Sequence, residues 1–178
     1  ALDTGAGFDA SLLLCQLAGR QGRGEEGEKA LAELSDRAAD DAELGLVTIA
    51  RLDNQAFFFG HVSEGLRVAD QAVAAISDPV WRDEILARRT GMILMTKGPA
   101  EGARAVDALL PTAAGRALVW ACITAEYCLV RLGRFDAVAA AADRGHAAHL
   151  ALSRPLDWDP WYHEYFRGLA LCCAGKLD

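Results

Sequence analysis

The chain has 178 residues, of which 52% are hydrophobic and 24% charged, and it carries a formal net charge of -7. A chain of this length can bury about 70% of its unfolded surface in one domain. Its acidic balance and scattered Lys and Arg argue against a nucleic-acid surface. The longest apolar stretch, 117–130, is interrupted by Glu126 and is too short to cross a membrane. The sequence predicts a folded cytoplasmic protein with no direct nucleic-acid contact and no membrane partner.

Hydrophobic periodicity predicts nine helices and no strand, so the expected class is all-α. We expect the helices at about 10–21, 25–39, 41–59, 62–76, 79–97, 100–110, 115–132, 137–152 and 161–174. Asp9, then Asp40 or Asp41, and Ser63 are candidate residues for opening the first, third and fourth helices. Residues 153–160 form the one extended connection.

Prolines and acidic residues mark further helix ends. Pro79 and Pro99 stand where a helix can begin, and Pro111 stands where one stops. The second helix opens with three carboxylates, which suit the positive end of the helix dipole. We expect these carboxylates on a solvated outer face: Glu25, Glu26 and Glu28.

Five cysteines occupy positions that are expected inside helices: Cys15, Cys122, Cys128, Cys172 and Cys173. Their number is odd and no Cys-x-x-Cys spacing is present, which disfavours a disulfide framework or a zinc site. We expect buried thiols that act as small hydrophobic groups in a reducing cytoplasm.

Both ends of the chain suggest a longer parent protein. The sequence begins with Ala1, without an initiator Met or a signal pattern, and stops shortly after Gly175. We therefore expect residues 1–178 to be a single domain cut from a longer multidomain chain. Arg and Ala are abundant and Lys is rare, which is typical of a GC-rich genome.

A glycine recurs at the same point of the helical pattern, at Gly22, Gly60, Gly98, Gly133 and Gly175, with separations of 38, 38, 35 and 42 residues. We call these the loop glycines. A small residue follows each of the first four after four or five positions: Gly27, Gly65, Gly102 and Ala137. This period, with two helices per unit, predicts a solenoid of helix pairs.

The pairs resemble tetratricopeptide repeats, although the consensus aromatic positions are poorly kept. Gly91 and Gly168 stand seven residues before a loop glycine, and a leucine recurs four before it, at Leu94, Leu129 and Leu171. The resemblance covers most of the chain. It implies a right-handed α-solenoid of antiparallel helix pairs.

The repeats are degenerate and Ala-rich and contain segments such as residues 132–137. They resemble the helical-repeat region of large ATP-dependent LuxR-family regulators, the MalT-like group common in actinobacteria. The resemblance implies a non-enzymatic sensing segment of a transcriptional regulator. Such a segment receives a small-molecule inducer or a partner protein and signals to neighbouring ATPase and DNA-binding domains. The alternative is a tetratricopeptide-like protein-protein interaction scaffold unrelated to transcription.

Phosphate-binding and catalytic motifs are not found. The glycine-rich run 22–30 departs from a P-loop because Glu28 precedes Lys29 and no Ser or Thr follows. His146 and His149 lie one helical turn apart and would form a metal site only if His163 or Asp159 approached. We favour exposed histidines, and predict no catalytic residue, metal or cofactor.

The tetratricopeptide resemblance implies a ligand- or peptide-binding concave face lined by the first helix of each pair. Aromatic and Met side chains there would supply contact area, and polar ones would orient a ligand. The alternative is that several of these residues, above all Phe57, Met92 and Trp120, belong to the core between helices. The expected positions are Asn54, Phe57, Phe58, Arg88, Met92, Met95, Trp120, Tyr127, Arg131, Tyr162 and Tyr165.

A cluster of aromatic residues near the end of the chain suggests a second surface: Trp158, Trp161, Tyr162, Tyr165 and Phe166. Rings of a terminal repeat that lack a covering helix form an exposed apolar patch. We expect a homodimer or crystal contact there, as a result of truncation.

Overall fold

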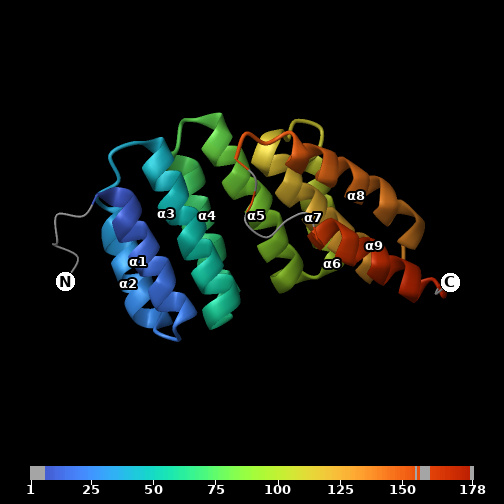
Figure 1. Cartoon of the computed structure of the whole chain (residues 1–178), viewed down its shortest axis with the longest axis horizontal. Coiled ribbons are helices and arrows are strands. Elements are labelled where there is room, and N and C mark those ends of the chain that lie inside the picture. Colours follow the sequence, from blue (N-terminus) through green and yellow to red (C-terminus); the bar gives the residue numbers. More distant parts are fainter. Residues whose placement is uncertain (1–6, 155, 157–160, 177–178) are drawn as a thin grey trace. The chain divides into compact units, whose positions relative to one another are not determined.

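A computed structural model of the chain describes residues 7–154, 156 and 161–176 (Figure 1). These residues form nine α-helices and one π-helical segment, so the all-α class and the number of helices are confirmed for the described ranges. The helices are α1 (Phe8–Arg20), α2 (Gly24–Ser35), α3 (Asp41–Asp53), α4 (Val62–Ala75), α5 (Pro79–Lys97), α6 (Pro99–Leu109), α7 (Gly115–Arg131), α8 (Phe135–Leu150) and α9 (Trp161–Cys173). The π-helical segment η1 (Asn54–Phe59) continues α3.

Within α1–α4 and within α6–α9, helices that follow one another in sequence pack against each other, as α1 packs on α2 and α7 on α8. The chain divides into two compact units, Ala1–Ile85 and Leu86–Asp178. Each unit is described by itself below. The sequence predicts one domain, and the division into two units falls inside α5.

The loop glycines end the first helix of each pair in a left-handed conformation. Gly22, Gly60, Gly98, Gly133 and Gly175 have φ values of 78°, 68°, 88°, 71° and 73°. Side chains with a Cβ adopt this region only at a cost, so glycine is the default residue there. The recurrence in the sequence therefore marks a real turn between helices.

Three of these turns share one hydrogen-bond pattern. At Gly22, Gly133 and Gly175 the glycine N–H donates to the carbonyl three residues back at 3.1 Å. The next residue's N–H donates to the carbonyl five residues back at 2.9 Å. This pair of bonds is the Schellman motif, which satisfies carbonyls at the end of a helix.

At two of these turns, the small residue that follows lets the second helix lie close to the first. A Cβ on Gly27 would lie 3.0 Å from the backbone oxygen of Cys15, and one on Gly102 would lie 2.7 Å from the Leu94 Cβ. An acidic residue precedes each small residue, in the first turn of the second helix, where the helix dipole favours it. These residues are Glu26, Glu64, Glu101 and Asp136.

Unit 1 has a core between α1, α2 and α3, formed by Leu12, Cys15, Leu31, Leu34, Val47 and Ala50. Asp40 caps α3 by accepting a hydrogen bond from the Glu43 N–H at 2.9 Å, which confirms one of the two predicted caps. Asp41 instead accepts from the N–H groups of Ser77 and Asp78 at 2.9 and 2.7 Å. It thereby ties the start of α3 to the α4–α5 turn.

Unit 2 has two core clusters. Ala87, Val106, Ala117, Ala121 and Ala125 form one, and Val138, Phe166 and Ala170 form the other. Alanine dominates the first cluster because short side chains allow helices to approach closely. Arg144 also donates to the Leu110 carbonyl at 2.8 Å and links α8 to the end of α6.

Some predicted helix starts and ends are wrong. Gly7, not Asp9, is the N-cap of α1, and Asp9 lies within its first turn. His61, not Ser63, is the N-cap of α4. The last turn of the third predicted helix is π-helical. The extended connection at 153–160 lies partly outside the described residues.

We expect Gly133→Ala to lower the free energy of unfolding by about 1–2 kcal/mol, because alanine is strained in the left-handed region. Gly168→Ala is the matched control, since Gly168 lies within α9 and nothing lies within 4 Å of the Cβ position. That change should raise stability by up to about 1 kcal/mol. Urea unfolding measures both, and equal effects would contradict the assigned turn.

Candidate functional site

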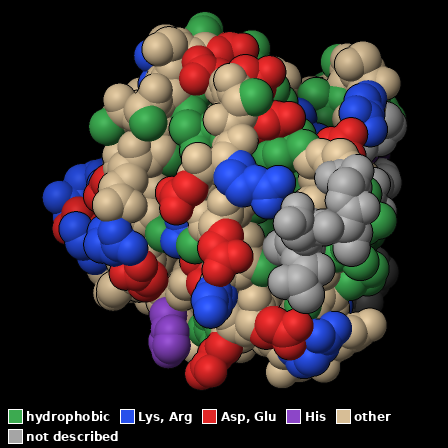
Figure 2. All heavy atoms as spheres, turned by 90° about the vertical axis from the view of Figure 1, so that its left-hand side faces the viewer, with side chains coloured by type: hydrophobic (Ala, Val, Ile, Leu, Met, Phe, Trp, Pro, Cys, Tyr) green, Lys and Arg blue, Asp and Glu red, His purple; other side chains and the backbone are tan. Residues whose placement is uncertain are grey.

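Large exposed hydrophobic side chains gather on the first helices of the pairs. On the described second helices α2, α4, α6 and α8, only Leu150 is of this kind. Figure 2, which looks onto the α1–α2 side, shows hydrophobic side chains among acidic and basic ones. The first helices and their ends carry Leu13, Leu14, Leu17, Phe57, Phe58, Val80, Met95, Tyr127, Leu132, Trp161, Tyr165 and Leu171.

In unit 1 the predicted site residues lie in η1. Phe57 and Phe58 are exposed, so the core alternative does not apply to Phe57. Phe58 lies beside α1, since a Cβ on Gly19 would be 3.4 Å from its ring. The His61 N–H, which follows the loop glycine Gly60, donates to the Gln55 carbonyl at 2.9 Å, six residues back. In the three Schellman turns the corresponding N–H donates five residues back. One additional residue is thus accommodated as a π turn before the loop glycine.

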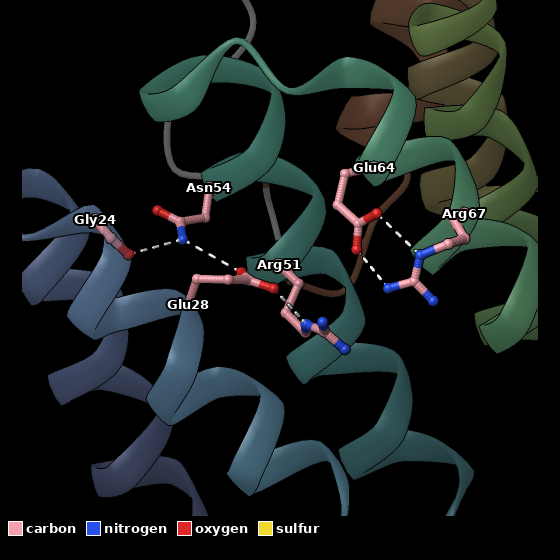
Figure 3. Close-up of polar contacts among 6 residues, drawn as sticks. All are labelled: Gly24, Glu28, Arg51, Asn54, Glu64 and Arg67. Atoms are coloured by element: carbon pink, nitrogen blue, oxygen red, sulfur yellow. Dashed lines mark hydrogen bonds and ion pairs between the residues drawn. The ribbon is translucent and has the colours of Figure 1, made fainter.

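Asn54 is buried and holds α2 rather than facing solvent. Its amide Nδ2 donates to the Gly24 carbonyl and to Glu28 Oε2, both at 3.3 Å (Figure 3). Arg51 Nε donates to Glu28 Oε1 at 2.8 Å, and both side chains of this ion pair are only 16% exposed. The prediction that Glu28 is solvated is therefore wrong, because its carboxylate contacts Arg51 of α3 and Asn54 of η1.

Glu64 and Arg67, also drawn in Figure 3, form an exposed ion pair one turn apart on α4. The hydrogen bond from Arg67 lowers the pKa of the Glu64 carboxyl. Exposed pairs of this kind add little stability. The same spacing recurs on α6, where Arg104 contacts Glu101.

In unit 2 the structure brings arginines onto aromatic rings. The Arg88 guanidinium carbon lies 3.9 Å from the centre of the Trp120 ring, a cation–π contact. The Arg131 guanidinium carbon lies 6.0 Å from the centre of the Tyr127 ring. Met95 is exposed, whereas Met92 is buried in the core as the alternative interpretation expected.

The aromatic residues of α9 differ in burial. Phe166 is buried and contacts Tyr127 of α7 edge-on at 5.5 Å between ring centres. Tyr165 contacts Phe166 at 5.2 Å, and Trp161 stacks on the half-buried Tyr162 at 4.1 Å. Trp161 and Tyr165 are exposed, and Trp158 lies outside the described residues.

A buried polar pair that the sequence did not predict joins α7 and α9. His163 Nδ1 lies 2.6 Å from Glu126 Oε1, and both side chains have no exposed surface. Gly145 of α8 makes room for the ring, since a Cβ there would lie 2.2 Å from His163 Cε1. Because the pair is fully buried and joins α7 to α9, it is placed to hold these helices together.

The structure gives no support to a metal site in the part it describes. No group of three or more His, Cys, Asp or Glu side chains there is arranged to hold a metal ion. His149 is buried, against the prediction of an exposed residue, and the half-buried His146 Nδ1 lies 3.7 Å from Glu164. Asp159 lies outside the described residues.

The cysteines separate into two classes. Cys15, Cys122 and Cys128 are buried, as predicted, but Cys172 and Cys173 are exposed free thiols at the end of α9. Burial raises the pKa of Cys122 and Cys128 to about 11, with smaller contributions from Glu126 and Asp107 respectively. The prediction of five buried thiols is therefore wrong for the last two.

A shallow hollow lies where the α7–α8 turn meets the end of α9. It is lined by Gly133, Arg134, Phe135, Asp136, Ala137, Ala174 and Lys176. None of these is a predicted site residue. The predicted residues therefore lie on the first helices, some exposed and some buried, and do not line this hollow.

Comparisons of the chain with protein families, with characterised proteins and with solved structures gave no match. Among the described residues, every helix is either too short or too polar to span a bilayer.

We expect Ellman's reagent to modify two thiols rapidly in the native chain and five after unfolding. The thiolate is the reactive form, and at about pH 8 the buried thiols stay protonated and shielded. A Cys172→Ser, Cys173→Ser double variant should then show no rapid reaction. Three or more rapid thiols in the native chain would contradict the assigned burial.

Removing one partner of the buried pair should be costly. Glu126→Ala should lower the free energy of unfolding by about 3 kcal/mol or more, because it leaves the other group buried without its partner. The exposed Glu164→Ala serves as control and should change it by less than about 0.5 kcal/mol. In urea unfolding, the Glu126→Ala, His163→Ala double variant should lose less free energy of unfolding than the two single variants lose together. Losses that simply add would argue against a direct interaction between the two side chains.

Proposed function

We propose that the helix pairs form a right-handed tetratricopeptide-like solenoid. Five recurrent glycines with positive φ and the small residues that follow four of them support this arrangement. Packing of sequence neighbours on each other, seen within α1–α4 and within α6–α9, is also what such repeats require.

We further propose that the first-helix surface of unit 2 binds a ligand or a peptide. The observation that carries the proposal is the concentration of exposed large hydrophobic side chains on the first helices, whereas Leu150 is the only one on the described second helices. In unit 2, Met95, Tyr127 and Tyr165 supply apolar area on this surface. Arg88 and Arg131, held by Trp120 and Tyr127, supply donors for an anionic or polyhydroxylated group.

The biological role we propose is the sensing segment of a LuxR-type transcriptional regulator, a role that rests on the sequence resemblance. The segment would bind a small-molecule inducer or a partner protein and signal to ATPase and DNA-binding domains of its parent chain. The large exposed side chains also support the scaffold alternative, because aromatic and Met groups suit a groove that binds an amphipathic peptide. Neither role requires catalysis.

Thermal unfolding in the presence of organic anions and oligosaccharides tests the sensing role. A ligand present at about 100 times its dissociation constant adds about 2.7 kcal/mol to stability. For a chain of this size, the melting temperature should then rise by about 5–10 °C. Arg88→Ala and Arg131→Ala should each lower the affinity for the ligand by about tenfold, because each removes a charged hydrogen-bond donor.

Arg104→Ala is the matched control, since Arg104 is exposed on the second helix α6 and should leave affinity unchanged. Unchanged affinity in both Arg88→Ala and Arg131→Ala would overturn the first-helix assignment. Binding to proteins from an extract, with no response to any small molecule, would favour the scaffold.

A further inference from the structure

Helix α7 has neighbours on every side but one. Thr124 Oγ1 lies 3.5 Å from the Cβ position of Gly91, so this side of α7 faces the first helix α5. Glu126 points to the next first helix, α9, where it contacts His163. A third side packs on the second helices α6 and α8. The fourth side of α7 is exposed even though both neighbouring first helices are present.

The exposed side of α7 carries a stripe of residues at spacings of four, three, four and four. It consists of Arg116, Trp120, Ile123, Tyr127 and Arg131. Side chains at these spacings lie on one face of a helix. Tyr127 and Arg131 are exposed, and the other three are half-buried. We call this set the α7 stripe. Its two arginines are fifteen residues apart, which corresponds to about 22 Å along an α-helix.

The charges at the surface of α7 and of the adjoining part of α5 are all positive. Residues 86–97 of α5 include Arg88, Arg89 and Lys97 and no acidic residue. The one acidic residue of α7, Glu126, is fully buried against His163. The second helices α6 and α8, in contrast, carry four acidic residues and two arginines. In a chain with a net charge of -7, this positive surface is a local feature of the first helices.

Two of the cations rest on aromatic rings of the α7 stripe. The guanidinium carbon of Arg88 lies 3.9 Å from the centre of the Trp120 ring, and that of Arg131 lies 6.0 Å from the centre of the Tyr127 ring. The N–H donors of a guanidinium lie in its own plane, in a geometry that matches both oxygens of a carboxylate. The stripe thus combines apolar area in its middle with positive charge towards both ends.

We propose that the α7 stripe binds an amphipathic peptide helix that has apolar residues on one face and acidic residues near both ends. This inference rests on the proposed binding surface of unit 2 and names its ligand. Charge complementarity favours an acidic partner. A helical peptide of about 15 residues spans about 22 Å and reaches both Arg116 and Arg131, whereas a small organic anion is too short. The rings and Ile123 contact the apolar face of the peptide, as in other helix-in-groove complexes.

Fluorescence anisotropy of a labelled synthetic peptide, measured with the full chain, tests this proposal. The probe is a helical peptide of about 15 residues with leucines on one face and glutamates in its first and last turns. The control probe has lysine in place of each glutamate. The glutamate peptide should bind at least about tenfold more tightly than the lysine peptide. Its affinity should fall about threefold or more when NaCl rises from about 50 mM to about 300 mM, because salt screens the charges.

Charge reversal on the stripe should change which peptide is preferred. Arg131→Glu should weaken binding of the glutamate peptide by at least about tenfold and strengthen binding of the lysine peptide by at least about threefold. A gain for the lysine peptide cannot come from loss of folding. The matched control is Arg104→Glu, which reverses an exposed charge on α6 and should change neither affinity by more than about twofold. Circular dichroism checks folding, and Arg116→Glu replaces Arg131→Glu if that variant fails to fold.

Equal affinities for the two peptides, no binding of the glutamate peptide, or unchanged preferences in the charge-reversal variant would overturn this inference. The proposed function has a separate readout, namely thermal unfolding with small organic anions. An anion that raises the melting temperature and binds more weakly to Arg131→Ala, together with no binding of the glutamate peptide, would overturn the peptide inference alone. If neither the anions nor the glutamate peptide bind, both fail.

Discussion

The close approach of two helices after a left-handed glycine is the constraint on which each pair depends. The glycine reverses the chain, and the small residue four or five positions later admits the backbone or Cβ of the first helix at contact distance, as Gly27 and Gly102 do. A larger side chain at either position would force the helices apart or strain the turn. Because the geometry recurs, side chains at equivalent positions have equivalent surroundings.

One partly buried and one fully buried polar cluster add specificity to this apolar framework. Glu28 connects α2 to Arg51 and Asn54 in unit 1, and the Glu126–His163 pair joins α7 to α9 in unit 2. Buried polar groups are costly unless paired, so each favours one arrangement of its neighbours over alternatives.

The helices and the turns between them could be predicted from the sequence because both depend on local chemistry. The signals were apolar periodicity, Pro79 and Pro99 at helix starts, and the loop glycines. The π turn was not predicted, since one additional residue in a helix leaves the apolar pattern nearly unchanged. Glu28 and Glu126 were missed because their partners are distant in sequence. Comparing positions relative to the loop glycine would have given a signal, since Glu126 stands where α1, α5 and α9 carry the apolar or small residues Cys15, Gly91 and Gly168, although α3 carries Asp53 there. Of the residues predicted to form the binding surface, Met92 and Asn54 are buried.

The most direct test of the paired-helix account is the stability of Gly102→Ala in urea. Its new Cβ would lie 2.7 Å from the Leu94 Cβ and 3.0 Å from Cys128 Sγ, so the helices must separate to admit it. The account predicts a loss of about 1–3 kcal/mol, the usual cost of overpacking, despite the better helix propensity of alanine. A variant as stable as the parent, or more so, would contradict the close approach on which the fold and its repeat are built.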